Sequence, residues 1–154
     1  MCSSDLDPKA NNFLFDLETG KAISMIDLDT VNAGLVQYDI GDCLRSGCNP
    51  LGEETEYWDK VFFDVDLCRA ILGEYLSVTR GFLSGEDLDY IYHAVRLLAF
   101  ELGLRFFTDY LEGNIYFKTR HAKHNLIRAL VQFKLAESIE DQEKVIQSIL
   151  HSAS

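Results

Sequence analysis

The segment Asp7-Pro8-Lys9-Ala10-Asn11-Asn12 carries the clearest chemical signal in this 154-residue chain, together with Asp27, which lies fifteen residues beyond Asn12. The two regions combine two carboxylates, an ammonium group and an amide within a short stretch of sequence. Transfer of a phosphoryl group from a magnesium-bound nucleotide uses this set. One carboxylate orients the attacking hydroxyl, a cation lies near the moving phosphoryl group, and an amide and a second carboxylate hold the magnesium ion. The residue types and their spacing therefore indicate phosphoryl transfer.

The residues between Asn12 and Asp27 predict a β-hairpin. Residues 12–15 and 22–27 form two short apolar runs, and residues 16–21 between them supply polar turn residues with a glycine. The start of the first strand and the end of the second lie on the same side of a hairpin. We therefore expect Asn12 and Asp27 to approach each other, as two ligands of one metal must.

The spacing Asp-x-Lys-x-x-Asn also has a simpler interpretation. A solvated loop that leads into a hairpin favours Asp, Pro, Lys and Asn as well. The sequence Ile26-Asp27-Leu28-Asp29 follows at the end of the second predicted strand. This second match favours a catalytic loop over a turn with no chemical role.

After residue 34 the sequence pattern becomes helical. Residues 38–45 predict a short helix, and residues 46–58, with their Gly, Asn-Pro and acidic residues, predict an exposed loop. Apolar residues at helical spacing then indicate a second helix that includes Leu67, Ile71, Leu72, Tyr75 and Leu76.

The strongest periodic signal belongs to a long helix that begins after Ser84. Ser84 with Glu86 and Asp87 resembles a helix N-cap and an acidic first turn, and the helix should end near Gly113. Its apolar stripe comprises Leu88, Ile91, Tyr92, Val95, Ala99, Leu102, Phe106 and Tyr110. A further helix is expected from about His124 to Glu137, with Leu126, Leu130 and Phe133 on one side. Ser138 with Asp141 should cap a last helix that continues to Leu150.

The length and composition indicate one globular domain. The hairpin and the helices predicted above make its class α+β, mostly helical. Lys and Arg total 14 against 25 Asp and Glu, a formal charge of −11, which argues against nucleic acid or an anionic membrane as partner. No apolar run is long enough to cross a bilayer, and the N-terminus does not resemble a signal peptide. The four cysteines form no close pairs, so we expect free thiols in a cytoplasmic protein. His121 and His124 have no nearby cysteine, which argues against a zinc site.

Three stretches together resemble the aminoglycoside phosphotransferase/choline kinase superfamily, whose fold is protein-kinase-like. They are residues 11–16, residues 26–31 and Tyr38-Asp39-Ile40-Gly41-Asp42. The stretch from Phe100 to Phe117 is similar to the phosphotransferases grouped with bacterial N-acetylhexosamine kinases. The resemblance covers nearly all of residues 1–154 and implies the C-terminal catalytic lobe of such an enzyme, mostly helical with a small hairpin near the N-terminus.

The resemblance implies a role for each polar residue of the motif. Asp7 would accept or orient the proton of the acceptor hydroxyl, and Lys9 would lie near the transferred phosphoryl group. Asn12 and Asp27 would bind the Mg²⁺ ion that accompanies ATP. Asp29 would be a further ligand of this ion or a carboxylate that supports its ligands. Each residue also has an alternative role without catalysis. Asp7 could cap a turn, Lys9 could be an ordinary exposed side chain, and the Asn12 amide could hydrogen-bond to the local backbone.

Two further pairs of polar residues have less certain roles. Arg105 and Asp109 are four residues apart and share a helical face. They could face the acceptor, for which a sugar is expected, or form a surface ion pair. For Asp39 and Asp42 we favour a structural role, since a carboxylate at the start of a helix satisfies free backbone N–H groups.

The chain departs from the family pattern in two ways. Asp5 stands where the family usually has His, two residues before the catalytic Asp. The glycine-rich region and nucleotide-binding Lys of an N-terminal lobe have no counterpart in these residues. We therefore expect the chain alone to be inactive and its exposed lobe surface, near the hairpin and after Asp29, to favour self-association. Two alternatives remain: a non-catalytic remnant or interaction module, and a kinase for an aminoglycoside or a choline-like alcohol.

Overall fold

The computed structural model describes residues 13–26, 34–79 and 81–152. In these ranges the chain forms a two-stranded hairpin followed by a helical body, so the predicted fold class is confirmed. The elements are β1 (Phe13–Phe15), β2 (Ala22–Met25), α1 (Val36–Gly47), the 3₁₀ helix η2 (Trp58–Lys60), α2 (Val65–Thr79), α3 (Gly85–Leu111), α4 (His124–Asp141) and α5 (Glu143–Ser152).

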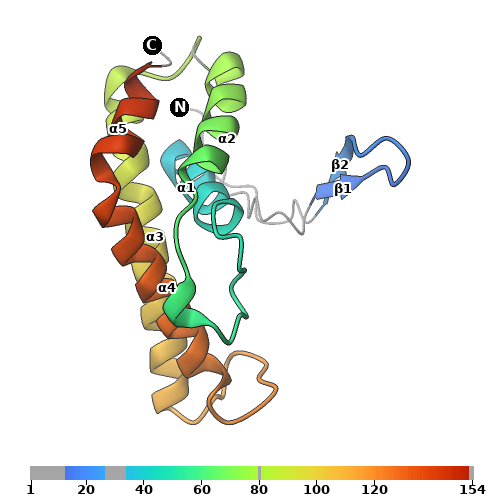
Figure 1. Cartoon of the computed structure of the whole chain (residues 1–154), viewed down its shortest axis with the longest axis vertical. Coiled ribbons are helices and arrows are strands. Elements are labelled where there is room, and N and C mark those ends of the chain that lie inside the picture. Colours follow the sequence, from blue (N-terminus) through green and yellow to red (C-terminus); the bar gives the residue numbers. More distant parts are fainter. Residues whose placement is uncertain (1–12, 27–33, 80, 153–154) are drawn as a thin grey trace.

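The helical body is built around α3. Helix α4 packs along it, α1 packs on another side, and α5 continues beyond α4 to contact both α3 and α2. Figure 1 shows α3, α4 and α5 as one elongated stack, with the hairpin standing apart from it. The core is a continuous apolar cluster with members from all of these helices, among them Leu44, Leu72, Val95, Leu135 and Ile146.

The start of α3 is fixed by the predicted cap. The Ser84 hydroxyl accepts a hydrogen bond from the Asp87 backbone N–H at 3.2 Å, and the Asp87 carboxylate accepts one from the Ser84 backbone N–H at 2.8 Å. This reciprocal pair satisfies two N–H groups that a helix start otherwise leaves without partners. The predicted stripe is confirmed, since its central members Ile91, Val95 and Phe106 are buried.

The hairpin joins the two predicted strands through the predicted turn. Phe13 pairs with Met25 and Leu14 with Ser24, in antiparallel orientation. At the turn, the Asp16 carboxylate accepts hydrogen bonds from the backbone N–H and the hydroxyl of Thr19, each at 2.7 Å. Gly20 follows with a φ of 66°, a left-handed conformation that glycine adopts without a steric penalty. The turn chemistry therefore explains why these few residues form a hairpin.

Two expectations about the connecting segments were wrong. Residues 46–58 were expected to form an exposed loop, but Ser46 and Gly47 belong to α1, and Cys48 and Asn49 are buried, with the Cys48 carbonyl accepting a hydrogen bond from the Asp64 N–H. The rest of the segment is exposed or half-buried. Ser138 does not cap the last helix. It lies inside α4, and its hydroxyl accepts the Phe63 backbone N–H at 3.0 Å. Helix α4 therefore runs past Glu137, and α5 begins only at Glu143.

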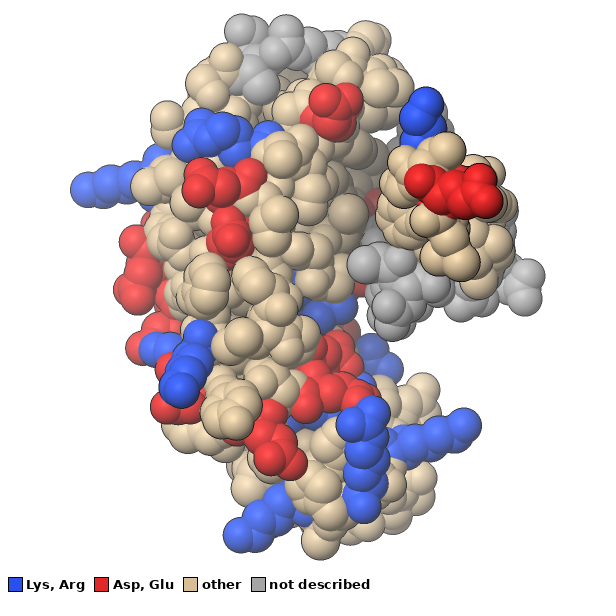
Figure 2. Space-filling view, turned by 45° about the vertical axis from the view of Figure 1, so that its right-hand side comes forward, with Lys and Arg blue, Asp and Glu red and all other residues tan. Residues whose placement is uncertain are grey.

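The three cysteines in the described ranges form no disulfide. Cys43, Cys48 and Cys68 are free thiols, as predicted, and Cys2 lies outside the described residues. None of the helices in the described ranges is both long and apolar enough to cross a membrane. Figure 2 shows acidic and basic side chains interspersed over one face, without a field of a single sign.

The contact between α3 and α4 depends on Gly103. A Cβ atom added there would lie 2.6 Å from the Phe133 ring, well inside van der Waals contact. We expect Gly103→Ala to lower the free energy of unfolding by about 1–2 kcal/mol. The forced displacement of α4 should outweigh the roughly 1 kcal/mol by which alanine favours a helix over glycine.

Gly73 in α2 is the matched control, because nothing lies within 4 Å of an added Cβ atom. Gly73→Ala should raise the free energy of unfolding by about 0.5–1 kcal/mol. Urea denaturation of the two variants measures both changes. A stabilised Gly103→Ala variant would show that the two helices are not in close contact.

Candidate functional site

The predicted catalytic and metal-binding residues lie outside the described residues. These are Asp7, Lys9, Asn12, Asp27 and Asp29. Their roles stay predictions, and the structure describes the elements on either side of them. Among the residues that it does describe, no group of three or more His, Cys, Asp or Glu side chains could hold a metal ion.

The hairpin register bears on the predicted metal ligands. Phe13 directly follows Asn12 in sequence, and Met25 precedes Asp27 by two residues. Phe13 and Met25 are paired partners at the open end of the hairpin. The two segments that carry the predicted ligands thus leave the described hairpin from the same end, which is the condition that the sequence argument required.

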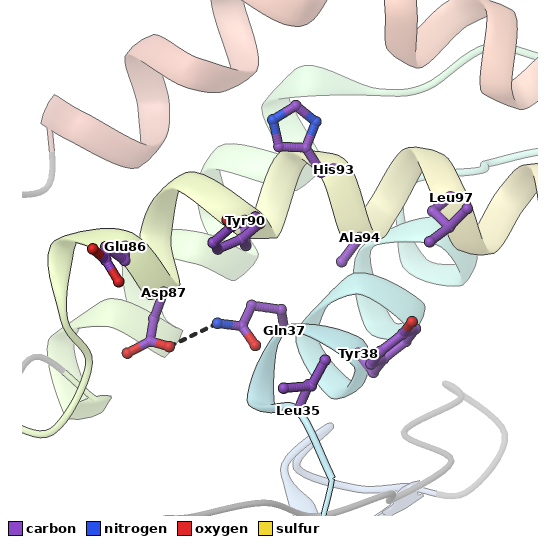
Figure 3. Close-up of a pocket in the computed structure, with 9 residues that line it drawn as sticks. All are labelled: Leu35, Gln37, Tyr38, Glu86, Asp87, Tyr90, His93, Ala94 and Leu97. Atoms are coloured by element: carbon purple, nitrogen blue, oxygen red, sulfur yellow. Dashed lines mark hydrogen bonds between the residues drawn. The ribbon is translucent and has the colours of Figure 1, made fainter.

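A hollow lies between α1 and α3, and the part of the chain that follows the predicted metal-binding segment forms one of its sides. The hollow has a volume of about 370 Å³. Figure 3 shows its lining, which is Leu35, Gln37, Tyr38, Glu86, Asp87, Tyr90, His93, Ala94 and Leu97. The Gln37 amide donates a hydrogen bond of 2.7 Å to Asp87 across it. Hydrogen bonds from Ser84, and then from Gln37, lower the pKa of Asp87, so this carboxylate is charged at neutral pH.

A chain of ion pairs, built on two largely buried arginines, links α1 to α4. Arg45 forms an ion pair with Asp42 at 2.7 Å and lies 3.6 Å from Glu53. Glu53 also pairs with Arg128 of α4. The structural role favoured for Asp42 is confirmed, although it acts by holding a buried arginine and not at the start of the helix. Asp39 does lie in the first turn of α1.

Asp109 lies buried at the C-terminal end of α3, with 3% of its surface exposed. Its carboxylate accepts the backbone N–H groups of Tyr116 and Phe117 at 2.7 and 3.0 Å and the Asn125 amide at 2.7 Å. Burial by itself would raise the pKa of Asp109, but the backbone hydrogen bonds from residues 115–117 lower it overall. The charged carboxylate therefore organises the loop between α3 and α4.

Arg105 is the exposed member of the predicted acceptor pair. Its guanidinium lies 5.5 Å from the centre of the Phe117 ring. With Asp109, Thr108, Glu112, Tyr116 and Phe117 it lines a hollow of about 320 Å³. The alternative of a surface ion pair does not describe Asp109, which is buried. The acceptor-binding role of Arg105 and Asp109 stays a prediction.

The two hollows lie at opposite ends of α3. Asp87, which bonds to α1, precedes Asp109 by 22 residues of the same helix. At about 1.5 Å per residue, this corresponds to roughly 33 Å along the axis. A direct contact between Arg105 and a group near the start of α1 would have to span much of this distance.

The sequence interpretation missed Asn125 and Arg128. Asn125 is fully buried and donates to both Asp109 and Asn114, while Arg128 lies 3.8 Å from the centre of the Phe106 ring. Both are polar residues three apart on a helix whose inner face also carries the apolar residues Ala129, Leu135 and Ile139. That interruption of the apolar pattern was visible in the sequence, although the partners were not.

Comparison with known protein families supports the superfamily inferred above. Residues 6–71 match the model of the phosphotransferase enzyme family. The matched range includes the Asp7–Asn12 segment, the hairpin, α1 and the first part of α2. The stretch Phe100–Phe117, on which the closer similarity to N-acetylhexosamine kinases rests, lies beyond it.

His124 makes the α3–α4 loop sensitive to pH. It is buried, and its Nδ1 accepts the Arg120 backbone N–H at 3.2 Å, which requires an unprotonated nitrogen. Burial lowers the pKa of His124 below its ordinary 6.5, Glu54 opposes this shift, and the nearby Arg128, His121 and Arg120 add to it.

We expect the protein to lose stability as the pH falls below 6.5. His124 contributes fully above its unfolded-state pKa of 6.5, and the contribution is lost as the pH falls through its lower folded-state pKa. Urea denaturation at pH 7.5 and 5.5 measures the loss, which His124→Gln should reduce. Equal pH dependence in His124→Gln and the wild type would contradict the assignment.

Proposed function

We propose that this chain is the catalytic lobe of an ATP-dependent small-molecule kinase, which transfers the γ-phosphoryl group to a sugar hydroxyl. One observation carries the proposal. The phosphotransferase family match covers residues 6–71, and within that range the pairing of Phe13 with Met25 supports the approach of the two predicted metal-binding segments. The predicted site thus has the residue types and the hairpin connection that the reaction requires.

In this proposal Asp7 and Lys9 act on the transferring group. Asp7 orients the acceptor hydroxyl and takes its proton as the oxygen attacks phosphorus. Lys9 places a positive charge beside the phosphoryl oxygens, whose negative charge must be stabilised during transfer. Neither residue forms a covalent intermediate, so their contribution is positioning and charge.

The proposed magnesium ligands have suitable chemistry. Mg²⁺ prefers hard oxygen donors and is usually bound through one or two carboxylates together with phosphate oxygens. Asn12 and Asp27 would supply an amide and a carboxylate oxygen from the two ends of one hairpin, with Asp29 two residues further on. When bound, the ion neutralises charge on the nucleotide phosphates.

A neutral sugar fits the face shown in Figure 2 better than a polycationic acceptor does. Although the formal charge is −11, acidic and basic side chains are interspersed on the face shown in Figure 2. A polycation such as an aminoglycoside would favour a dense acidic surface. The proposed acceptor class rests on the similarity of Phe100–Phe117 to sugar kinases, with Arg105 as the exposed polar group. The distance between Arg105 and the start of α1 counts against a direct contact of Arg105 with a group at that end of α3.

These residues supply only part of a complete active site in this proposal. No counterpart of a glycine-rich region or of a nucleotide-binding lysine is found among the 154 residues. Because positioning of the nucleotide phosphates supplies much of the rate, we infer that the 154-residue chain does not turn over ATP by itself. A polypeptide that also carries a nucleotide-binding lobe should do so, whereas a non-catalytic remnant would stay inactive.

Metal binding can be tested on the chain itself. Mn²⁺ occupies the same oxygen sites as Mg²⁺ and broadens nearby NMR signals. We expect it to broaden the backbone amides of Phe13 and Met25 more than those of the turn near Glu18. Asp27→Ala should weaken Mn²⁺ binding about tenfold or more, because it removes a charged ligand. Glu18→Gln, which removes the same charge at the other end of the hairpin, should not.

The catalytic roles can be separated in a polypeptide that includes a nucleotide-binding lobe. Asp7→Asn should lower kcat by roughly 10²–10⁴-fold and leave the affinity for Mg-ATP unchanged, because Asp7 acts on the acceptor hydroxyl. Asp27→Ala should lower both kcat and the affinity for Mg-ATP. Turnover assays and a nucleotide titration with magnesium measure the two effects. Equal losses of nucleotide affinity would show that the two carboxylates have been assigned to the wrong roles.

A further inference from the structure

Helix α3 has an apolar stripe on the side that faces away from the core. Its large side chains are Tyr90, Leu97, Phe100, Leu104, Phe107 and Leu111, with exposed fractions of 60, 46, 49, 43, 36 and 68%. We call these six residues the outer stripe. They lie on the opposite side of α3 from the buried residues Ile91, Val95 and Phe106. A helix that needed to bury only one face would carry polar residues here.

The spacing of the outer stripe identifies the kind of element that fits it. From Leu97 onward its members follow one another at intervals of three, four, three and four residues. Residue 93, a histidine, continues the pattern toward Tyr90. This alternation gives a straight apolar seam along a helix and is the pattern by which two helices pack in a coiled coil. The outer stripe therefore fits another helix.

Neighbouring helices flank the outer stripe but leave it exposed. On one side, α1 approaches Ala94 and Leu98 through Gly41. On the other side, α4 approaches through Phe133, whose ring centre lies 5.8 Å from that of Phe100, and Arg96 pairs with Glu140 of α4. At its N-terminal end the outer stripe runs into the hollow of Figure 3, where Tyr90 and Leu97 lie beside Leu35 and Tyr38.

We propose that the outer stripe is the interface of a homodimer in which α3 of two copies pack antiparallel about a two-fold axis near Leu102. In this register Leu97 faces Phe107 of the second copy, and Phe100 faces its Leu104. Each pair places a leucine opposite a phenylalanine, and the same two contacts recur on both sides of the axis. Such self-complementarity is what a two-fold interface requires.

The charges beside the outer stripe favour the antiparallel orientation. Glu101 and Arg105 are four residues apart and exposed on one edge of it. With the axis near Leu102, Glu101 of one copy lies only about 3 Å along the helix axis from Arg105 of the other. A parallel pair in register would instead place Glu101 and Arg105 of the two copies on opposite edges of the interface, where they could not pair with each other.

The area of the outer stripe suits a reversible dimer. Six large side chains, each of roughly 150–250 Å² and about half exposed, would bury on the order of 600 Å² per copy. A stable interface buries about 800 Å² per partner, so this contact lies at the lower end of the range. The formal charge of −11 on each copy opposes association. Added salt should therefore strengthen the dimer by screening that repulsion.

Sedimentation equilibrium of the 154-residue chain over a dilution series tests the proposal. We expect a monomer–dimer equilibrium that shifts toward dimer at higher salt. Leu104→Glu should raise the dissociation constant about a hundredfold, because the charge enters the interface twice. Val78→Glu makes the same kind of change at an α2 site that is 79% exposed, and it should leave the dissociation constant unchanged. Circular dichroism and the Tm check that both variants fold.

A charge exchange tests the orientation. Glu101→Arg should weaken the dimer by placing like charges near Arg105 of the other copy, and adding Arg105→Glu to it should restore association. A wild-type chain that stays monomeric at high concentration would overturn the proposal. So would a dimer that Leu104→Glu does not weaken more than Val78→Glu, because association would then use another surface, such as that of the hairpin. An unchanged dimer in Glu101→Arg would overturn the antiparallel register.

Discussion

The burial of the inner face of α3 is the constraint on which the helical body depends. Ser84 and Asp87 set where this 27-residue helix begins, and its apolar stripe then receives α1, α4 and α5. Close approach needs a small residue at the crossing, and Gly103 provides it opposite Phe133. Because cores are packed as tightly as crystals, the position of α3 determines where each neighbouring helix can lie.

Polar side chains within the helical body link α1, α4 and the loop after α3. Arg45, Glu53 and Arg128 link α1 to α4, and Asn125 extends the connection to Asp109 and the loop after α3. Arg45 and Arg128 are largely buried, and pairing with Glu53 offsets the cost of burying their charges. The network gives Asp109 a structural task whether or not Arg105 meets an acceptor.

The proposed chemistry and the proposed interface use different parts of the molecule. In sequence, the predicted catalytic residues flank the hairpin and precede α1, within the matched residues 6–71. The outer stripe runs along α3, beyond the matched residues 6–71. The two regions meet at the hollow of Figure 3, where Tyr90 and Leu97 of the outer stripe lie beside Leu35 and Tyr38.

The local patterns of the sequence were sufficient for the hairpin, the Ser84 cap and the inner stripe of α3, because turn chemistry, capping and helical periodicity act between residues close in the chain. They also indicated the residue types of a phosphotransferase site, whose geometry around Asp7 and Asp27 remains a prediction. Contacts between distant segments could not be obtained in this way. Ser138 looked like a cap but bonds to Phe63, 75 residues away, and Asp109 looked like a surface residue but is buried against the loop that follows it. Which residues make such contacts depends on how distant segments pack together, so these contacts were known only from the tertiary structure.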